Sequence, residues 1–207
     1  MNWSLNNEDP VWYVAYGSNM SAARFTCYLS GGRPRGGRRT YTGARNQSPP
    51  RRDSAIRLPG GLVFAGESTV WGGGIAFYDT HAEGELAARA YLLTFGQLSD
   101  VVAQEGRRPV GTDLTLDHPA GRRWVLPSQA YETLLHVGER DAVPMLTITS
   151  GVQLVPTAPS AAYLRTVLAG LGETFGWNVE QRVDYLVRAR GVVPTWTADA
   201  LAGLCAE

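Results

Sequence analysis

Two kinds of hydrophobic pattern alternate along this chain: short unbroken apolar runs, which predict strands, and apolar residues three and four positions apart, which predict helices. Residues 11–16 (VWYVAY) form the first run and predict a buried strand. The Gly17-Ser18-Asn19 sequence that follows is typical of a turn, and residues 20–29 fit a short helix. The other segments that predict strands are 62–64, 75–78, 87–94, 112–116, 131–137 and 143–149.

Two glycine-rich stretches interrupt this order. Residues 31–59 are rich in Gly, Pro and Arg, so we expect a long loop with little regular structure there. Gly72-Gly73-Gly74 predicts a close approach between two stretches of backbone. These glycines lack the GxGxxG spacing of a dinucleotide site, so we expect no such cofactor.

The segment 95–106 carries an acid in an apolar helical pattern. Leu98, Val101 and Val102 recur at helical spacing, and Glu105 falls at the next position of the same stripe. Gly106 then predicts the end of the helix, in the position after the cap that favours a left-handed residue. This helix therefore presents a carboxyl group at its end, on its buried side.

The chain changes character after residue 155. Pro159 fits the first turn of a helix whose apolar residues repeat at helical spacing. A second helix is predicted from Asn178 as cap, with Gln181 in a capping-box position and Gly191 at its end, and a short third helix follows Thr197. The fold class is therefore α+β. We expect a β-rich domain over residues 1–155 and a helical extension over 156–207 that packs on it or forms a homodimer interface.

Composition narrows the chemistry. The chain has 207 residues, of which 44% are hydrophobic, so it is long enough and apolar enough to fold around a core of its own. All 19 basic residues are Arg, which excludes a Schiff-base lysine and a Walker-type phosphate loop. The formal net charge is zero, so no global field attracts nucleic acid or anionic lipid. No zinc-ligand spacing links the few metal-binding residue types, which are Cys27, Cys205, His81, His118 and His136.

The sequence predicts no membrane segment. No apolar stretch approaches the length of a membrane-spanning helix, and the first ten residues lack the pattern of a signal peptide. Two cysteines far apart in the chain suggest free thiols, so we expect a cytoplasmic location.

Three motifs in order carry a family resemblance: Tyr16-Gly17-Ser18-Asn19-Met20 after the first strand, the segment 71–77 (WGGGIAF), and Gln104-Glu105-Gly106. Together they resemble the γ-glutamylcyclotransferase-like family, which includes the AIG2-like proteins of plants. Over residues 11–137 the resemblance implies a small mixed β-barrel flanked by helices. It also implies an enzyme without a cofactor, which releases an amine from a γ-glutamyl amide and forms 5-oxoproline.

The resemblance assigns roles to particular residues. In this chemistry the substrate's own amino group attacks its γ-carbonyl, so no protein nucleophile is required. Glu105 occupies the position of the family's catalytic glutamate, and we expect it to carry out both proton transfers. The turn from Gly17 to Met20 would hold the γ-glutamyl end of the substrate with main-chain N–H groups. Tyr16 is either a pocket residue or a core aromatic, and Tyr131 is a weaker match to a pocket tyrosine of the family.

The sequence is also compatible with other functions. One is a non-catalytic protein that binds a small molecule or anion on the same fold, and another is a protein-interaction module that uses the helical tail. Between residues 33 and 57 eight arginines face one acid, Asp53. This loop is either a solvated surface, a site for an anionic substrate or carrier, or a nucleic-acid patch; Tyr41 is its only aromatic, which disfavours base stacking.

Overall fold

The apolar run near the start of the chain is strand β1 (Pro10–Ala15), an interior strand of a six-stranded mixed sheet. The computed structural model describes residues 5–116, 123–128, 130–152 and 154–206. β1 pairs antiparallel with β5 (Glu85–Thr94) and parallel with β8 (Val143–Thr149). The full sheet order is β2-β5-β1-β8-β7-β6, with β2 at Arg52–Pro59, β7 at Thr133–Arg140 and β6 at Arg123–Val125.

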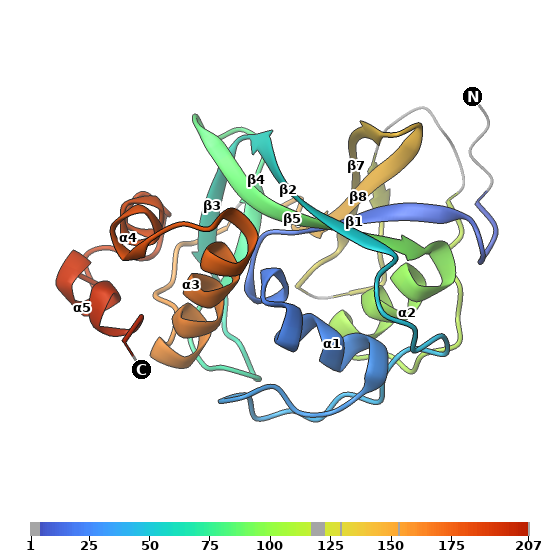
Figure 1. Cartoon of the computed structure of the whole chain (residues 1–207), viewed down its shortest axis with the longest axis horizontal. Coiled ribbons are helices and arrows are strands. Elements are labelled where there is room, and N and C mark those ends of the chain that lie inside the picture. Colours follow the sequence, from blue (N-terminus) through green and yellow to red (C-terminus); the bar gives the residue numbers. More distant parts are fainter. Residues whose placement is uncertain (1–4, 117–122, 129, 153, 207) are drawn as a thin grey trace.

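Strand β1 is buried on both of its faces, which explains why its sequence is apolar throughout. Trp12 and Val14 point into a core that contains the C-terminal helices, whereas Val11 and Tyr13 point into a second core. The second core is built with helices α1 (Ala22–Ser30) and α2 (Phe95–Glu105), which lie side by side against one face of the sheet (Figure 1).

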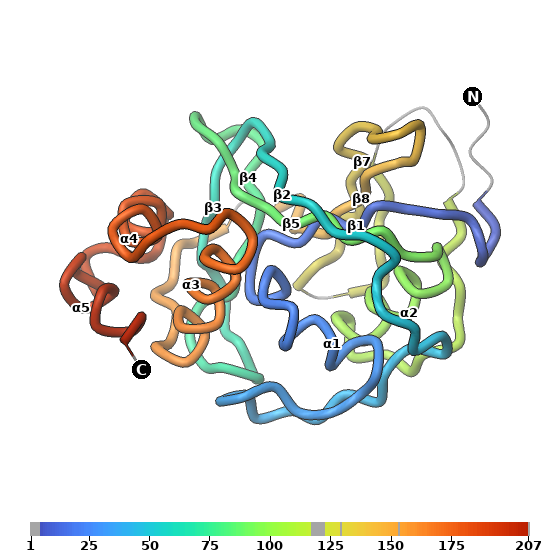
Figure 2. Tube along the Cα trace, viewed as in Figure 1, coloured from blue at the N-terminus to red at the C-terminus, as the bar shows by residue number. Residues whose placement is uncertain are grey.

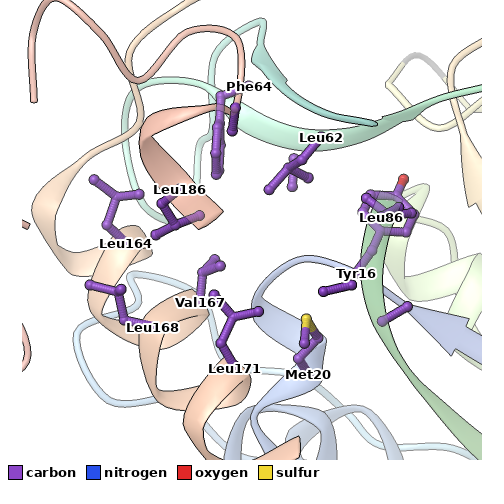
Figure 3. Close-up of a cluster of buried hydrophobic side chains, with 14 of the residues drawn as sticks. Tyr16, Met20, Leu62, Phe64, Leu86, Leu164, Val167, Leu168, Leu171 and Leu186 are labelled. Atoms are coloured by element: carbon purple, nitrogen blue, oxygen red, sulfur yellow. The ribbon is translucent and has the colours of Figure 1, made fainter. Parts of the chain in front are cut away.

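Helix α3 (Ala161–Phe175) fills the first core. Its apolar side chains meet Leu62 and Phe64 of strand β3 (Gly61–Ala65) and the side chain of Met20 (Figure 3). α4 (Val179–Val187) and α5 (Ala198–Gly203) pack outside α3, at the end of the chain coloured red in Figure 1. No helix in the described part of the chain is both long enough and apolar enough to cross a bilayer.

The sheet does not close into the barrel that we expected. β3 forms a separate two-stranded sheet with β4 (Ile75–Asp79). A side chain joins this hairpin to the main sheet: the Thr149 hydroxyl accepts a bond from the Tyr78 N–H and donates one to the Tyr78 carbonyl, at 3.0 and 2.9 Å. Since this hydroxyl takes up both main-chain groups of Tyr78, no strand ladder continues from β4 to β8 in the described residues.

Two strand expectations were wrong. Residues 52–59 form strand β2 rather than loop; its residues are mostly exposed because it lies at the sheet edge, so its sequence carries no buried-strand pattern. Residues 112–116 form no strand. There the main-chain N–H groups of Gly111 and Leu114 bond the side chains of Asp100 and Ser99 on α2, so α2 and not the sheet holds this segment.

The predicted starts of α4 and α5 are confirmed, whereas the start of α3 and the end of α4 differ from the prediction. Asn178 and Gln181 form the predicted capping box of α4, and Thr197 caps α5. Pro159 lies just before the α3 cap, Ser160, and not in the first turn. α4 ends at Val187, well before Gly191.

The triple glycine makes the predicted close approach. Gly73 has a φ of 65°, and a Cβ there would lie 2.5 Å from the carbonyl oxygen of Ala158. This contact fixes the start of β4 against the segment before α3.

Candidate active site

The turn after β1 is a short 3-10 helix, η1 (Ser18–Met20), in which the Met20 N–H bonds the Gly17 carbonyl at 3.0 Å. Ser18 and Asn19 are buried. A Cβ on Gly17 would lie 3.0 Å from both the Ala76 Cβ and the Tyr163 hydroxyl, so glycine lets the turn approach β4 and α3. The turn is therefore held against two elements, β4 and α3, that are far from it in the sequence.

Asn19 joins this turn to Glu105, the last residue of α2. Its Nδ2 donates to the Glu105 carboxylate at 3.0 Å and to the Tyr13 hydroxyl at 3.1 Å. Glu105 is half-buried at the end of the helix. The carboxyl group is thus held at a set position beside the turn.

The end of α2 differs from the sequence expectation by one residue. Gly106 is the C-cap residue, with a φ of −76° and a ψ of 5°, and its N–H bonds the Val102 carbonyl. The left-handed residue is Arg107, with a φ of 57°. A non-glycine residue in this conformation is uncommon and often marks a functional site.

A cavity of about 30 Å³ lies between the turn and Glu105. It also contacts Tyr13 on β1 and Ala76 on β4. A second cavity, of about 90 Å³, shares four of the lining residues of the first and extends toward Arg24, Arg39 and Arg107. The shared residues are Ser18, Glu105, Tyr131 and Tyr163. Glu105 therefore lies in the wall that is common to the first cavity, which is the size of a water molecule, and the second cavity, which three arginines also line.

Four tyrosines line the first cavity together with Glu105: Tyr13, Tyr16, Tyr131 and Tyr163. Burial raises the pKa of Tyr13, Tyr131 and Tyr163 above the ordinary value for a phenol, and the nearby Glu105 charge adds to each rise. These hydroxyls therefore stay neutral at neutral pH. Tyr163 accepts a bond from the Ala76 N–H at 3.2 Å and Tyr131 donates to the Ala76 carbonyl at 3.0 Å, which ties β4 to the cavity.

Arg24 of α1 lies in the second cavity's wall, enclosed by aromatic rings. It is 4% exposed, and its Nη2 donates to the hydroxyls of Tyr28 and Tyr41 at 2.9 and 2.8 Å. The guanidinium carbon lies 4.4 and 4.5 Å from the centres of those two rings. A buried cation is thus fixed near the Glu105 carboxylate.

The structure brings together most of the residues that the sequence singled out. Tyr16, Gly17, Ser18, Asn19, Glu105 and Tyr131 all line the first cavity. The side chain of Met20 does not: it is fully buried in the core against α3 (Figure 3), and its N–H is taken up within η1.

The start of α1 does not offer a free anion site either. The Glu173 carboxylate, from α3, accepts a bond from the Ala22 N–H at 2.8 Å and one from the Ser21 hydroxyl at 3.1 Å. Because another part of the chain already supplies the anion there, the field of this helix is directed at Glu173.

Sequence reasoning missed several lining residues. The sequence pattern predicts only that Tyr163 lies on the apolar face of a helix and Tyr13 in a buried strand. Ala76 lies in the 71–77 motif, which carried the resemblance without being assigned a role. Of these residues, only Ala76 could have been found from the sequence, through that motif. Nothing in the local pattern around Tyr13 or Tyr163 distinguishes a core tyrosine from one beside a cavity.

The described residues contain no group of three His, Cys, Asp or Glu side chains that could hold a metal ion. His118 lies outside them. Cys27 is buried and Cys205 is partly exposed, and both are free thiols.

Comparison with known proteins supports the fold. No family model matches the chain. It is 31% identical over 201 residues to a protein of Arabidopsis thaliana named histone deacetylase 5; the match covers 86% of this chain but spans only 30% of that relative's length.

Two solved structures align with nearly the whole chain. A γ-glutamyl cyclotransferase aligns with a TM-score of 0.55 at 15% identity, over 96% of this chain and all of the other. The crystal structure of an uncharacterised human protein aligns with a TM-score of 0.54 at 16% identity, over 95% and 99% of the two chains. This chain therefore has a fold similar to that of a γ-glutamyl cyclotransferase.

Proposed function

We propose that this protein is an enzyme of the γ-glutamylcyclotransferase-like type, which releases an amine from a γ-glutamyl amide, or a related γ-acyl amine, and forms 5-oxoproline. The support comes from the similar fold and from the residues that line the first cavity. The Asn19–Glu105 hydrogen bond carries the proposal, since it holds a carboxylate next to the turn where the substrate would bind.

The reaction needs a proton acceptor, a proton donor and a site for developing negative charge. The substrate's α-amino nitrogen attacks its own γ-carbonyl carbon, and a five-membered ring closes as the new C–N bond forms. Glu105 accepts the proton that the attacking nitrogen loses and returns it to the leaving nitrogen as the old C–N bond breaks. Because nucleophile and carbonyl belong to one molecule, correct positioning can contribute about 7–11 kcal/mol.

The remaining residues position the substrate. The main-chain N–H groups of the Gly17-Ser18-Asn19 turn would face the carbonyl oxygen that gains charge. Tyr16 holds the turn's geometry, because its hydroxyl donates to the Ile148 carbonyl at 2.5 Å. Tyr131 contributes a neutral wall beside Glu105. Met20 contributes to the core beneath the turn and not to the pocket surface.

A single substitution tests the proposal. The Glu105→Gln protein keeps the size of the side chain but cannot accept a proton, so we expect 5-oxoproline formation from a panel of γ-glutamyl amino acids and amines to fall about 10²–10⁴-fold. Glu83→Gln is the matched control, because Glu83 is exposed and outside the cavity. Circular dichroism checks that both variants are folded.

Two other results would point elsewhere. Undiminished turnover in Glu105→Gln would remove this residue from the mechanism. If no substrate in the panel yields 5-oxoproline but some raise the melting temperature, the protein is a non-catalytic small-molecule binder on the same fold.

A further inference from the structure

A third cavity, of about 580 Å³, shares Arg24 and Trp71 with the second cavity. Its walls come from α1, the loop 33–36, α3 and the end of the chain at Leu204 and Cys205. Figure 2 shows how the long loop between α1 and β2 runs along the α1 side of the molecule. The volume is within the range of small-molecule binding sites.

The charge of this cavity has one sign. Five arginines line it, and none of its lining residues is acidic: Arg24, Arg33, Arg35, Arg165 and Arg182. Glu173 bonds the Ser21 hydroxyl at the cavity and also pairs with Arg89 at 3.3 Å, so its charge is already compensated. The exposed guanidinium groups of Arg33 and Arg35, together with the buried cation of Arg24, favour a ligand with more than one negative charge.

Three of the eight loop arginines form ion pairs in the described structure. Arg45, Arg52 and Arg57 form ion pairs with acids. Arg33 and Arg35, at the cavity, have no acidic partner within ion-pair distance among the described residues. Arg33 and Arg35 therefore bring uncompensated charge to the wall of the cavity.

Arg24 is a second, independent indication of a ligand. Its side chain is buried, and its Nε and Nη1 atoms have no hydrogen-bond partner in the described structure. Buried guanidinium donors are normally paired, since leaving one unpaired costs free energy. An anion in the cavity that Arg24 lines would supply acceptors for these two donors.

The cavity also has an apolar part. Trp71, Leu168 and Leu204 line it together with small residues of α1 and α3. Inorganic ions would leave these surfaces uncovered, whereas a ligand with a ring or hydrocarbon body would bury them.

We propose that this cavity binds an organic phosphate, a small molecule that joins two or more phosphate charges to an apolar or aromatic body. The phosphates lie against the arginines, whose planar forks bind phosphate oxygens in pairs, and the body covers Trp71 and Leu168. The site has no lining residue in common with the first cavity, so the inference does not depend on the proposed reaction.

Binding of chosen probes tests the proposal by titration calorimetry at physiological salt. Adenosine triphosphate is the probe that has both the phosphates and an aromatic body. Adenosine has the aromatic body without phosphates, and tripolyphosphate has the phosphates without a body. A single-stranded oligonucleotide tests binding of a polymeric anion. We expect adenosine triphosphate to bind more tightly than each of the other three. The Arg33→Gln/Arg35→Gln protein should bind it at least ~10-fold more weakly, because charge-assisted hydrogen bonds are lost.

The matched control removes the same charge elsewhere. Arg51→Gln/Arg188→Gln changes two exposed arginines outside the cavity, and its affinity should equal that of the unaltered protein. The four substituted arginines are exposed, so we expect both double variants to fold. Arg24 is not substituted, because it is buried and its loss would disturb folding. Equal weakening in both double variants, or no binding of adenosine triphosphate, would overturn the site. Tighter binding of the oligonucleotide would replace it with a nucleic-acid surface.

Discussion

At the scale of single residues, Asn19 is the group on which the candidate site depends. Its Nδ2 binds both Glu105 and Tyr13, while its Oδ1 is buried and has no hydrogen-bond partner in the described structure. An acceptor left unpaired in this way costs about 1–3 kcal/mol unless a ligand supplies a donor. Under the proposed function, the ammonium group of a γ-glutamyl substrate supplies such donors.

The Asn19→Ala substitution removes both functions of this amide. If a hydrogen bond to a charged group is worth about 1.5–3 kcal/mol, we expect kcat/KM for 5-oxoproline formation to fall roughly 10- to 100-fold. Asn46→Ala, at an exposed loop position outside the cavity, should leave it unchanged. Full activity in Asn19→Ala would show that Glu105 needs no positioning by this residue.

At the scale of elements, helix α3 holds the turn of the candidate site in place by close packing. A Cβ on Gly170 would lie 2.7 Å from the Cβ of Met20, so the helix backbone approaches η1 more closely than any other residue type permits. On the same helix, a Cβ on Gly172 would meet only the flexible end of Arg182, at 3.2 Å. The two glycines therefore have different reasons to be present.

Alanine at these two positions gives opposite results. Gly170→Ala should lower the free energy of unfolding by about 1–3 kcal/mol through overpacking, despite the better helix propensity of alanine. Gly172→Ala should be neutral or stabilise the protein by up to about 1 kcal/mol. Urea denaturation measures both. Equal effects of the two substitutions would contradict the close contact between α3 and η1.

At the scale of the whole molecule, tyrosine ionisation should control stability in alkali. Burial raises the pKa of all nine tyrosines in the chain, and that of Tyr185 rises to about 12. In the unfolded chain the pKa of a tyrosine side chain is about 10. Because the folded state prefers the protonated form, it keeps its full stability below that pH and loses it as the pH rises through the folded pKa values.

We therefore expect the free energy of unfolding to fall steeply above a pH of about 10, with tyrosinate forming as the protein unfolds. Ultraviolet absorbance of tyrosinate and far-ultraviolet circular dichroism, followed in one pH titration, should change together. Tyrosinate that forms at the pH of free phenol while the circular dichroism is unchanged would show that the hydroxyls are exposed.

The sequence by itself determined what depends on neighbours along the chain. The pattern of hydrophobic residues predicted β1 and α2, and the capping-box residues predicted the start of α4. Both signals depend only on residues a few positions apart. It also indicated Glu105 and the Gly17-Ser18-Asn19 turn as parts of one site through the family resemblance. Where the pattern is weak, as in the exposed edge strand β2, the same reasoning failed.

Only the tertiary structure decided which distant groups meet. Asn19 and Glu105 are 86 residues apart in the chain, and their hydrogen bond exists because β1 and α2 lie against each other. The open sheet and the burial of Arg24 between two cavities likewise have no local signature. Contacts of this kind arise from the packing of whole elements, which composition and spacing along a single chain do not encode.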